Sequence, residues 1–516
     1  MIKEMLRLIN KQQKQPPPSA EKLIGEQEDL KNKKFLSNLE DNLSVIKKLY
    51  SIPDNKDVKL REMHLEGFGK NAALLFISTI SDVKSIEENI LKPLTENTSA
   101  NKKVKDVVSI QMVHEIEIFK DAVKDVNKGN ALLILDGEAK GYILDCPDFQ
   151  SRAIEKPESE ILIKGPKEAF NEKVVANISL LRKKIKNENL IVEGIEVSQR
   201  SHNDVYILYI RGLANEKLVD NIKERLGSLE VNAIQNLSLL EEYIEERNYS
   251  LFPSVLTTER PDRAASFLED GYIALLMDNS PDSLVLPATF WSFFHSPEDH
   301  YLRIHYGNFT RALRMVALFI TLFTSAIYIA ITTFHAEMIP PDLLLAIASS
   351  REKVPFPAVI EILVMEAAFE LIREAGLRVP SPIGPTIGIV GALILGQAAV
   401  EANIISPIVI IVVALGGLSS FAVADLSLNF AVRLIRFAFI LSAAFLGIYG
   451  MTAFFAAGIF YLVSLKSFGV PYLAPLSPSY KSSKDTIFRR LVKNEKLRPG
   501  FLKTSDSQKK AMGHKQ

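Results

Sequence analysis

Long apolar segments are confined to residues 313–466 of this 516-residue chain, and the remainder is rich in charged side chains. Residues 313–334 include roughly 20 consecutive uncharged residues, enough for a helix to cross about 30 Å of hydrocarbon. Further apolar segments occupy residues 383–400, 407–423, 437–449 and 451–465. The pattern predicts an all-α polytopic membrane domain of about five to six helices, one of them the amphipathic or re-entrant segment 356–375.

The charged region before this domain is typical of an α/β head with two subdomains. A strand at 72–77 precedes a helix at 81–91, a strand at 205–210 precedes a helix at 216–226, and a hairpin is expected within 131–144. The predicted divisions are a flexible segment 1–55, subdomain 1 over 56–155, a helical linker with subdomain 2 over 156–250, a membrane-proximal segment 251–312, the transmembrane domain 313–466 and a basic tail 467–516.

Basic residues indicate the orientation in the membrane. Arg311 and Arg314 lie at the start of the first apolar segment, and Arg433 and Arg436 precede the last two apolar segments. Because loops rich in Lys and Arg stay inside, head and tail are both expected in the cytoplasm, which requires an even number of crossings. The N-terminal residues contain no apolar signal core, and the single Cys146 suits a reducing compartment.

No catalytic, cofactor or metal site is predicted. Residues 67–70 (GFGK) lack the Ser or Thr that follows the Lys of a phosphate-binding loop, and they precede a strand instead of a helix. His295, His300 and His305 recur every five residues, which spreads them around a helix, and no Cys lies nearby to complete a zinc site. They are interpreted as interfacial polar residues. The chain is expected not to be an enzyme and not to bind nucleic acid.

Several runs resemble the A-type subunit of GerA-family spore germinant receptors. The most specific is the membrane-proximal motif Thr258, Glu259, Arg260, Pro261 and Asp262. Similar runs are Gly165 to Phe170, Arg182 to Lys184, Pro297 to Asp299 and Val354 to Pro357. The resemblance covers roughly residues 160–470. It departs at Ser325 and at Ala424–Asp425, where the family pattern has Pro or a Pro-type turn.

The resemblance implies a component of a multi-subunit receptor in the spore inner membrane. Its partners would be a transporter-like B subunit and a lipoprotein C subunit. The A subunit would act as a signal transducer and assemble into a homo-oligomeric channel for monovalent cations. The alternatives are a non-conducting scaffold, a paralogous germination component, and a secondary transporter, for which a mirrored second half would be expected.

The segment 356–375 is the candidate for a mechanism. At 100° per residue one stripe of this helix collects the pore-lining candidates Val359, Leu363, Glu366, Glu370 and Glu374. Several copies around an axis would stack acidic rings beside an apolar constriction, as cation pores do. The alternative is that these acids are solvated, or paired with Arg373, Arg378, Arg433 or Arg436.

Two further features have a predicted role in packing or lipid binding. Gly384, Gly388 and Gly391 would allow close approach of another membrane helix. The basic tail, with Arg489, Arg490 and Lys493, would attract anionic lipid.

Overall fold

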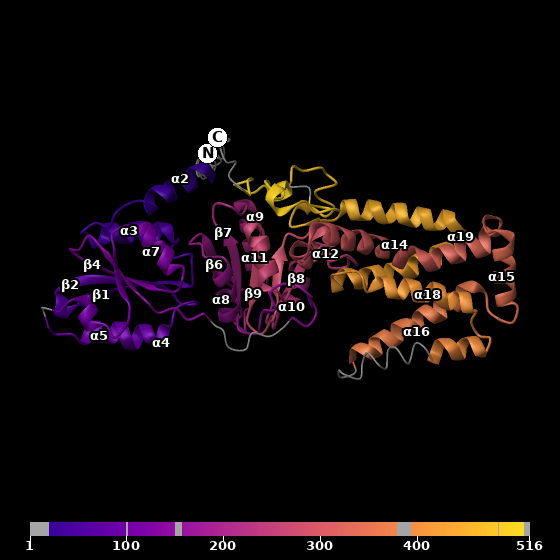
Figure 1. Ribbon diagram of the computed structural model, residues 1–516, viewed down its shortest axis with the longest axis horizontal. Coiled ribbons are helices and arrows are strands. Elements are labelled where there is room, and N and C mark those ends of the chain that lie inside the picture. The colour runs from indigo at the N-terminus through magenta and orange to yellow at the C-terminus, as the bar shows by residue number, and fades with distance from the viewer. Residues whose placement is uncertain (1–19, 100–101, 150–156, 379–393, 483–484, 510–516) are drawn as a thin grey trace, which may run out of the picture.

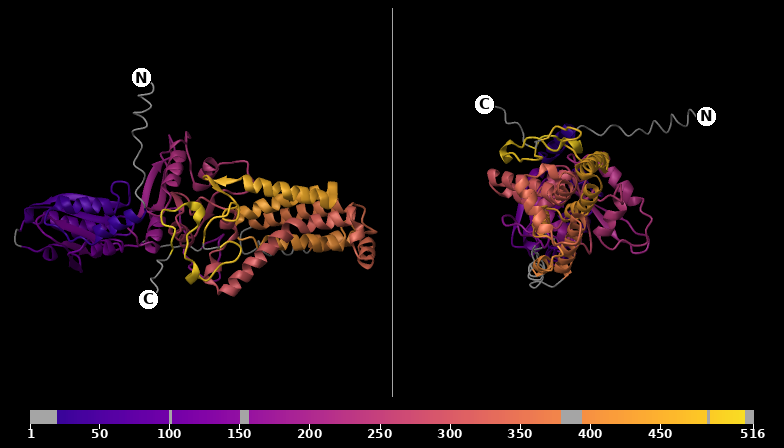
Figure 2. Two further views of the ribbon diagram at one scale, coloured as in Figure 1. Left: turned by 90° about the horizontal axis from the view of Figure 1, so that it is seen from above. Right: turned by 90° about the vertical axis from the view of Figure 1, so that its right-hand side faces the viewer.

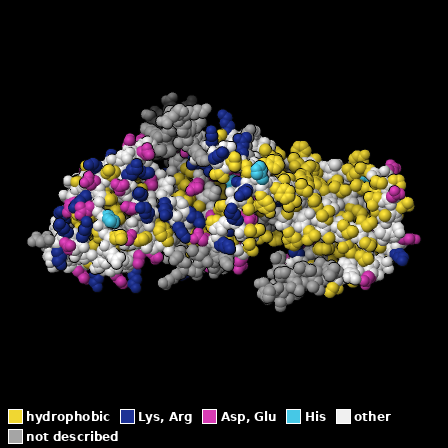
Figure 3. Space-filling view, in the orientation of Figure 1, with side chains coloured by type: hydrophobic (Ala, Val, Ile, Leu, Met, Phe, Trp, Pro, Cys, Tyr) yellow, Lys and Arg dark blue, Asp and Glu magenta, His cyan; other side chains and the backbone are white. Residues whose placement is uncertain are grey.

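The computed structural model describes residues 20–99, 102–149, 157–378, 394–482 and 485–509. Two α/β units and a domain of long helices follow one another along the longest axis of the molecule (Figure 1). Charged side chains cover the α/β units, whereas apolar side chains cover the helical domain (Figure 3). A large exposed apolar surface of this kind is typical of a site that contacts a membrane or other proteins.

The first unit is a five-stranded antiparallel sheet in the order β1-β2-β4-β5-β3. Its strands are β1 (Val58–Leu65), β2 (Lys70–Ile77), β3 (Val113–Ile116), β4 (Ala131–Leu135) and β5 (Gly141–Leu144). Helices cover both faces: α3 (Leu39–Leu49) and α7 (Phe119–Val126) on one, and α4 (Val83–Ser85), the π-helical turn Ile86–Leu91, α5 (Lys92–Glu96) and α6 (Val104–Val107) on the other. α2 (Ala20–Lys31) precedes them.

Strand β2 shows why the predicted run at 72–77 is apolar throughout. Ala73 and Leu75 face α3 and α7, whereas Leu74 and Phe76 face the opposite helices. Because successive side chains point to opposite faces, a sheet covered on both sides buries every residue of such a strand. The predicted hairpin forms as β4 and β5, and Asp82 caps α4 by accepting a hydrogen bond from the backbone N–H of Ser85.

The second unit is also antiparallel, in the order β6-β7-β9-β10-β8. Its strands are β6 (Leu190–Glu196), β7 (Asp204–Ile210), β8 (Leu256–Thr258), β9 (Ile273–Met277) and β10 (Ser283–Leu286). Helices α8 (Val174–Lys184) and α11 (Pro261–Glu269) pack on one face, and α9 (Glu216–Gly227) and α10 (Leu237–Ile244) pack on the other.

Counted along the chain, both units place their strands in the same order, 1-2-4-5-3. The two strand-helix patterns read from the sequence start at β2 and β7, which hold the same position in the two sheets. Strands β8 to β10 belong to the segment predicted as membrane-proximal, so the second sheet extends past the expected boundary at residue 250. The head is α/β as predicted, and its sheets are wholly antiparallel.

The helical domain contains α14 (Ile304–Phe334), α15 (Pro341–Arg351), α16 (Ala358–Arg378), α18 (Pro407–Ser420) and α19 (Leu426–Ser464). Within the described residues, α14 and α19 are long and apolar enough to cross a membrane, and α18 is a shorter apolar helix. The predicted five to six spanning helices are therefore shown only in part. Gly384, Gly388 and Gly391 lie outside the described residues.

Helix α19 reverses direction at Gly447, whose φ of 60° and ψ of −140° are not helical. The rings of Phe439 and Phe454, on either side of this point, lie 4.8 Å apart, so α19 is a helical hairpin. The predicted segments 437–449 and 451–465 fall in its two arms.

The tail returns to the second α/β unit, as seen in yellow in Figure 2. After β11 (Lys466–Ser467) and β12 (Val470–Pro471), Tyr472, Phe501 and Leu502 join a core that includes Leu318 of α14 and Leu428 of α19. This core fixes the base of the helical domain to the head.

Candidate functional site

Arg182 joins the two α/β units. It belongs to the run Arg182 to Lys184, one of those that resemble GerA-family sequences. Its guanidinium is buried and donates to both carboxylate oxygens of Asp57, at 2.9 and 2.8 Å. Beside this pair the backbone N–H of Lys56 donates to the carbonyl oxygen of Val192 at 2.8 Å. A buried pair with two parallel hydrogen bonds gives the joint a defined geometry.

The membrane-proximal motif attaches the start of α11 to the loop before α8. Arg260 is 1% exposed, and its Nη2 donates to the carbonyl oxygen of Pro166 at 2.6 Å and to Oδ2 of Asp262 at 3.1 Å. Pro261 occupies the first turn of the helix, where a missing N–H costs little. The hydroxyl of Tyr301 also donates to Oδ2 of Asp262, at 2.5 Å.

Glu259 of the motif and Arg263, which follows it, bind the same loop. Glu259 accepts a hydrogen bond from the backbone N–H of Glu158 at 2.8 Å. Arg263 pairs with Glu160 and donates to the carbonyl oxygen of Ser292 at 2.9 Å. Glu259 and Arg260 of the predicted motif therefore bind backbone groups of this loop, whereas Asp262 binds the side chains of Arg260 and Tyr301.

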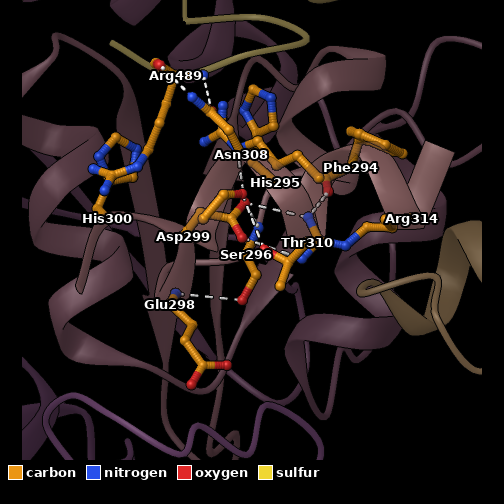
Figure 4. A network of polar contacts seen from close by, with 12 residues as sticks. Phe294, His295, Ser296, Glu298, Asp299, His300, Asn308, Thr310, Arg314 and Arg489 are labelled. Atoms are coloured by element: carbon orange, nitrogen blue, oxygen red, sulfur yellow. Dashed lines mark hydrogen bonds and ion pairs between the residues drawn. The ribbon is translucent and has the colours of Figure 1, made fainter. Parts of the chain in front are cut away.

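Asp299 is the centre of a second network, at the base of α14 (Figure 4). It lies in the short helix α13 (Glu298–Tyr301), which follows α12 (Phe290–Phe294). Its Oδ2 accepts from Nε of Arg311 at 2.9 Å and from Nη1 of Arg314 at 3.2 Å. Arg314 also donates to the carbonyl oxygen of Phe294 at 2.7 Å. Two arginines predicted to mark the inside of the membrane are thus bound by one buried acid.

Two titratable groups of this junction have shifted pKa values. Burial raises the pKa of Asp299, but the hydrogen bonds and charges of Arg314 and Arg311 outweigh it and hold that pKa below its ordinary value. Burial, with a further contribution from Arg311, lowers the pKa of His295 to about 4. The His295 ring contacts the carbonyl oxygen of Thr486 in the tail. Asp299 is therefore charged and His295 neutral at neutral pH.

The tail completes this network. Asp485 pairs with Arg311, and Arg489 donates from Nη2 to the carbonyl oxygen of Leu302 at 2.6 Å. Asn308 and Arg489 exchange two hydrogen bonds, at 2.9 and 3.2 Å. Arg489 is buried, so it binds the base of α14 within the chain, whereas Arg490 and Lys493 are exposed.

A third network lies inside the helical domain, on α16. Glu366 is 0% exposed. Its Oε1 accepts from the hydroxyl of Ser325 on α14 at 2.7 Å, and its Oε2 lies 2.7 Å from Nη2 of Arg436 on α19. A Cβ on Gly416 of α18 would lie 3.8 Å from Arg436 and 3.9 Å from Ser325, so this glycine brings a third helix close.

Glu370, one turn further along α16, binds three arginines. It accepts from Nη2 of Arg436 at 2.9 Å, from Arg433, and lies 3.8 Å from Arg373. Arg373 in turn donates to the hydroxyl of Ser420 at the end of α18, at 2.9 Å. Among the described residues, three guanidinium groups thus surround two carboxylates, so the charges of Glu366 and Glu370 are paired inside the helical domain.

The rest of the predicted stripe is divided between two environments. Val359 and Leu363 pack, partly buried, against the core of the helical domain, whereas Glu374 is exposed. Glu361, expected on another face of the helix, is buried and accepts from Arg351 at 3.2 Å and from the backbone N–H of Ser406 at 2.9 Å. The sequence offered no signal for the roles of Ser325 and Ser406.

Comparison with known proteins assigns the family. The profile described as Bacillus/Clostridium GerA spore germination protein matches residues 44–501. The chain belongs to the GerA family. GerA-family relatives include Spore germination protein KA of Bacillus subtilis (strain 168), which is 37% identical, with 91% of this chain and 87% of the relative covered. Spore germination protein A1 of the same strain is 36% identical, with 89% and 95% covered.

Two further matches are a membrane protein and a solved domain. The Uncharacterized membrane protein YfkQ of Bacillus subtilis (strain 168) is 35% identical, with 95% of this chain and 96% of the relative covered. The crystal structure of the N-terminal domain of the A subunit of the Bacillus megaterium spore germinant receptor GerK3 covers 50% of this GerA-family chain and 98% of its own, at 25% identity and a TM-score of 0.39.

Proposed function

We propose that this chain is the A-type subunit of a nutrient germinant receptor in the spore inner membrane. The matches to spore germination proteins KA and A1 over about nine tenths of the chain support this assignment. The partners in this proposal are the transporter-like B subunit and the lipoprotein C subunit of the same receptor. The exposed Arg490 and Lys493 would add attraction to anionic lipid.

The proposed topology has an even number of crossings with head and tail in the cytoplasm. It counts α14, α16, the predicted apolar segment 383–400, α18 and the two arms of α19. The reversal at Gly447 and the shared core of Leu318, Leu428 and Leu465 support it, because the first and last crossings then start and finish beside the head. Arginines at this end agree with the positive-inside rule.

The buried ion network on α16 carries the functional proposal. Glu366 and Glu370 are held by arginines of α16 and α19, and Ser325 adds α14 to the same network. In this state the carboxylates of Glu366 and Glu370 are paired with arginines of the same chain. We propose that in a homo-oligomer a nutrient signal separates these pairs, and that the released carboxylates then line a path for monovalent cations.

The signal would reach this network through the base of α14. Asp299 binds Arg311 and Arg314 at one end of the helix, and Ser325 binds Glu366 further along it. A rigid movement of α14 relative to the head would therefore act on both networks. Such a shift of a packed helix is a common element of switching proteins.

Germination of spores that produce only variant forms of this chain tests the proposal. Arg433→Gln removes one guanidinium group that holds Glu370 and keeps the carboxylate, so we expect cation release at lower nutrient concentration, or without nutrient. Lys353→Gln, at an exposed cation of the helical domain outside this network, is the matched control and should behave like the unmodified chain. Release of K⁺ and the amount of protein in the membrane are both measured.

Two results would contradict the gating role. Normal cation release from Arg433→Gln spores, at an unchanged protein level, would show that the network does not restrain the path. Normal cation release from Glu370→Gln spores would show that this carboxylate does not line the path, and would favour a non-conducting scaffold, the main alternative for this chain.

A further inference from the structure

A cavity of about 450 Å³ lies between the second α/β unit and the tail. His300, Asp485 and Glu495 are among the residues that line it. One ligand atom of each of these three side chains lies within 4.8 Å of the others. His300 comes from α13, whereas both acids come from the tail, so the cluster forms only when the tail is docked.

Each acid uses one oxygen for a cationic side chain and directs the other toward the imidazole. Asp485 pairs with Arg311 through Oδ1, and its Oδ2 lies 3.1 Å from Nε2 of His300. Glu495 lies 3.9 Å from Nζ of Lys509 through Oε2, and its Oε1 lies 4.0 Å from Nδ1 of His300. Arg311 and Lys509 thus hold the carboxylates from outside, as outer partners of metal ligands do.

A second observation that points to a bound cation concerns the carboxylate of Glu495. Its side chain is 8% exposed, and its Oε1 has no hydrogen-bond partner in the described part of the chain. A buried carboxylate oxygen without a donor is unfavourable, because it has lost its hydrogen bonds to water and accepts none from the protein in their place. A cation bound to Oε1 would compensate for the missing hydrogen bonds.

We propose that His300, Asp485 and Glu495 bind a divalent transition-metal ion such as Zn²⁺. One imidazole nitrogen and two carboxylate oxygens are donors that suit Zn²⁺ better than Mg²⁺ or Ca²⁺. Metal–ligand distances of about 2.0 to 2.2 Å require the three atoms to move together by about 1 Å, which side-chain rotation can supply. The cavity leaves room for water as the remaining ligand.

The ion would fasten the tail to the base of α14. Asp485 belongs at once to this site and to the pair with Arg311, and Arg311 binds Asp299. Metal binding would therefore stabilise the docked tail and, through it, the junction between the head and the first membrane helix. This inference does not depend on the channel proposal.

Metal titration of the purified full-length protein in detergent tests the inference. After treatment with a chelator, we expect Zn²⁺ to bind at one ion per chain in calorimetry, and Co²⁺ to give the absorption bands of a protein-bound ion. His300→Gln and Glu495→Gln should each weaken Zn²⁺ binding by at least about tenfold. His305→Gln, at an exposed histidine of the same region, should not change it.

Proteolysis of the tail gives a second readout. Zn²⁺ should slow trypsin cleavage at the exposed Arg490 and Lys493 in the unmodified protein but not in Glu495→Gln. Equal circular dichroism spectra would show that the variant is folded. Absence of Zn²⁺ binding at micromolar concentration, or equal binding by His300→Gln and the unmodified protein, would overturn the inference and leave a metal-free network of ion pairs.

Discussion

Replacing Arg182 by Met is expected to open the joint between the two α/β units. The side chains of Arg182 and Asp57 are 2% and 4% exposed, and within the described part of the chain the Asp57 carboxylate would retain only its hydrogen bond from the hydroxyl of Thr79, at 3.0 Å. Breaking a buried ion pair by removal of one partner costs about 3 to 5 kcal/mol, because the remaining charge stays buried. Each difference of about 1.4 kcal/mol changes an equilibrium constant tenfold, so the equilibrium constant for opening of the joint should rise at least about 100-fold.

Hydrogen exchange at the joint measures this effect directly. The backbone N–H groups of Lys56 and Val192 bond across the two units, at 2.8 and 3.1 Å, and should exchange at least about 100-fold faster in Arg182→Met. Lys183→Met is the matched control: its pair with Glu168 has side chains that are 43% and 23% exposed, so the change costs at most about 1 kcal/mol. Equal exchange in both variants would refute the reasoning.

Three further predictions concern stability and reactivity. Because the pKa of His295 is lowered to about 4 in the folded chain and is about 6.5 when unfolded, the unfolded chain binds the extra proton first. Stability should therefore fall between pH 6.5 and 4, and His295→Gln should flatten this dependence of the melting temperature; an unchanged slope would contradict it. Burial raises the pKa of Cys146 to about 12, so iodoacetamide should label the native thiol at pH 8 far more slowly than the denatured one, as mass spectrometry can show. Gly447→Ala should lower the melting temperature, with a cost of about 1 to 3 kcal/mol, because φ is +60° and the new Cβ would lie 2.9 Å from Cβ of Phe334. Gly458→Ala, which meets nothing within 4 Å, should not lower it, and equal effects of the two changes would contradict this account of the turn.

The strands of the head could be predicted because each α/β unit covers its sheet on both faces. Buried strands such as β2 and β7 then appear as short, continuous apolar runs. The extent of the second unit could not be predicted in the same way. β8 pairs with β10 and not with a neighbour in sequence, and its three residues give no periodicity to read.

The acids of α16 could be located from the sequence, but their partners could not. Periodicity placed Glu366 and Glu370 on one stripe and left open a pore, water or arginines. The packing of α14, α16 and α19 brings Arg433 and Arg436 to them, 63 to 70 positions away in sequence. Arg489 was expected to attract lipid, and the structure buries it against Asn308 because the tail folds back onto the head.

Cation flux through purified, reconstituted protein tests the central claim most directly. Liposomes with the unmodified chain are compared with liposomes that contain Arg433→Gln/Arg436→Gln, at equal protein content and with the oligomeric state measured. The account predicts low K⁺ flux through the unmodified chain and higher flux through the double variant, because the carboxylates of Glu366 and Glu370 are released from these arginines. Well-assembled oligomers of both forms that conduct no cations would contradict it and favour a scaffold.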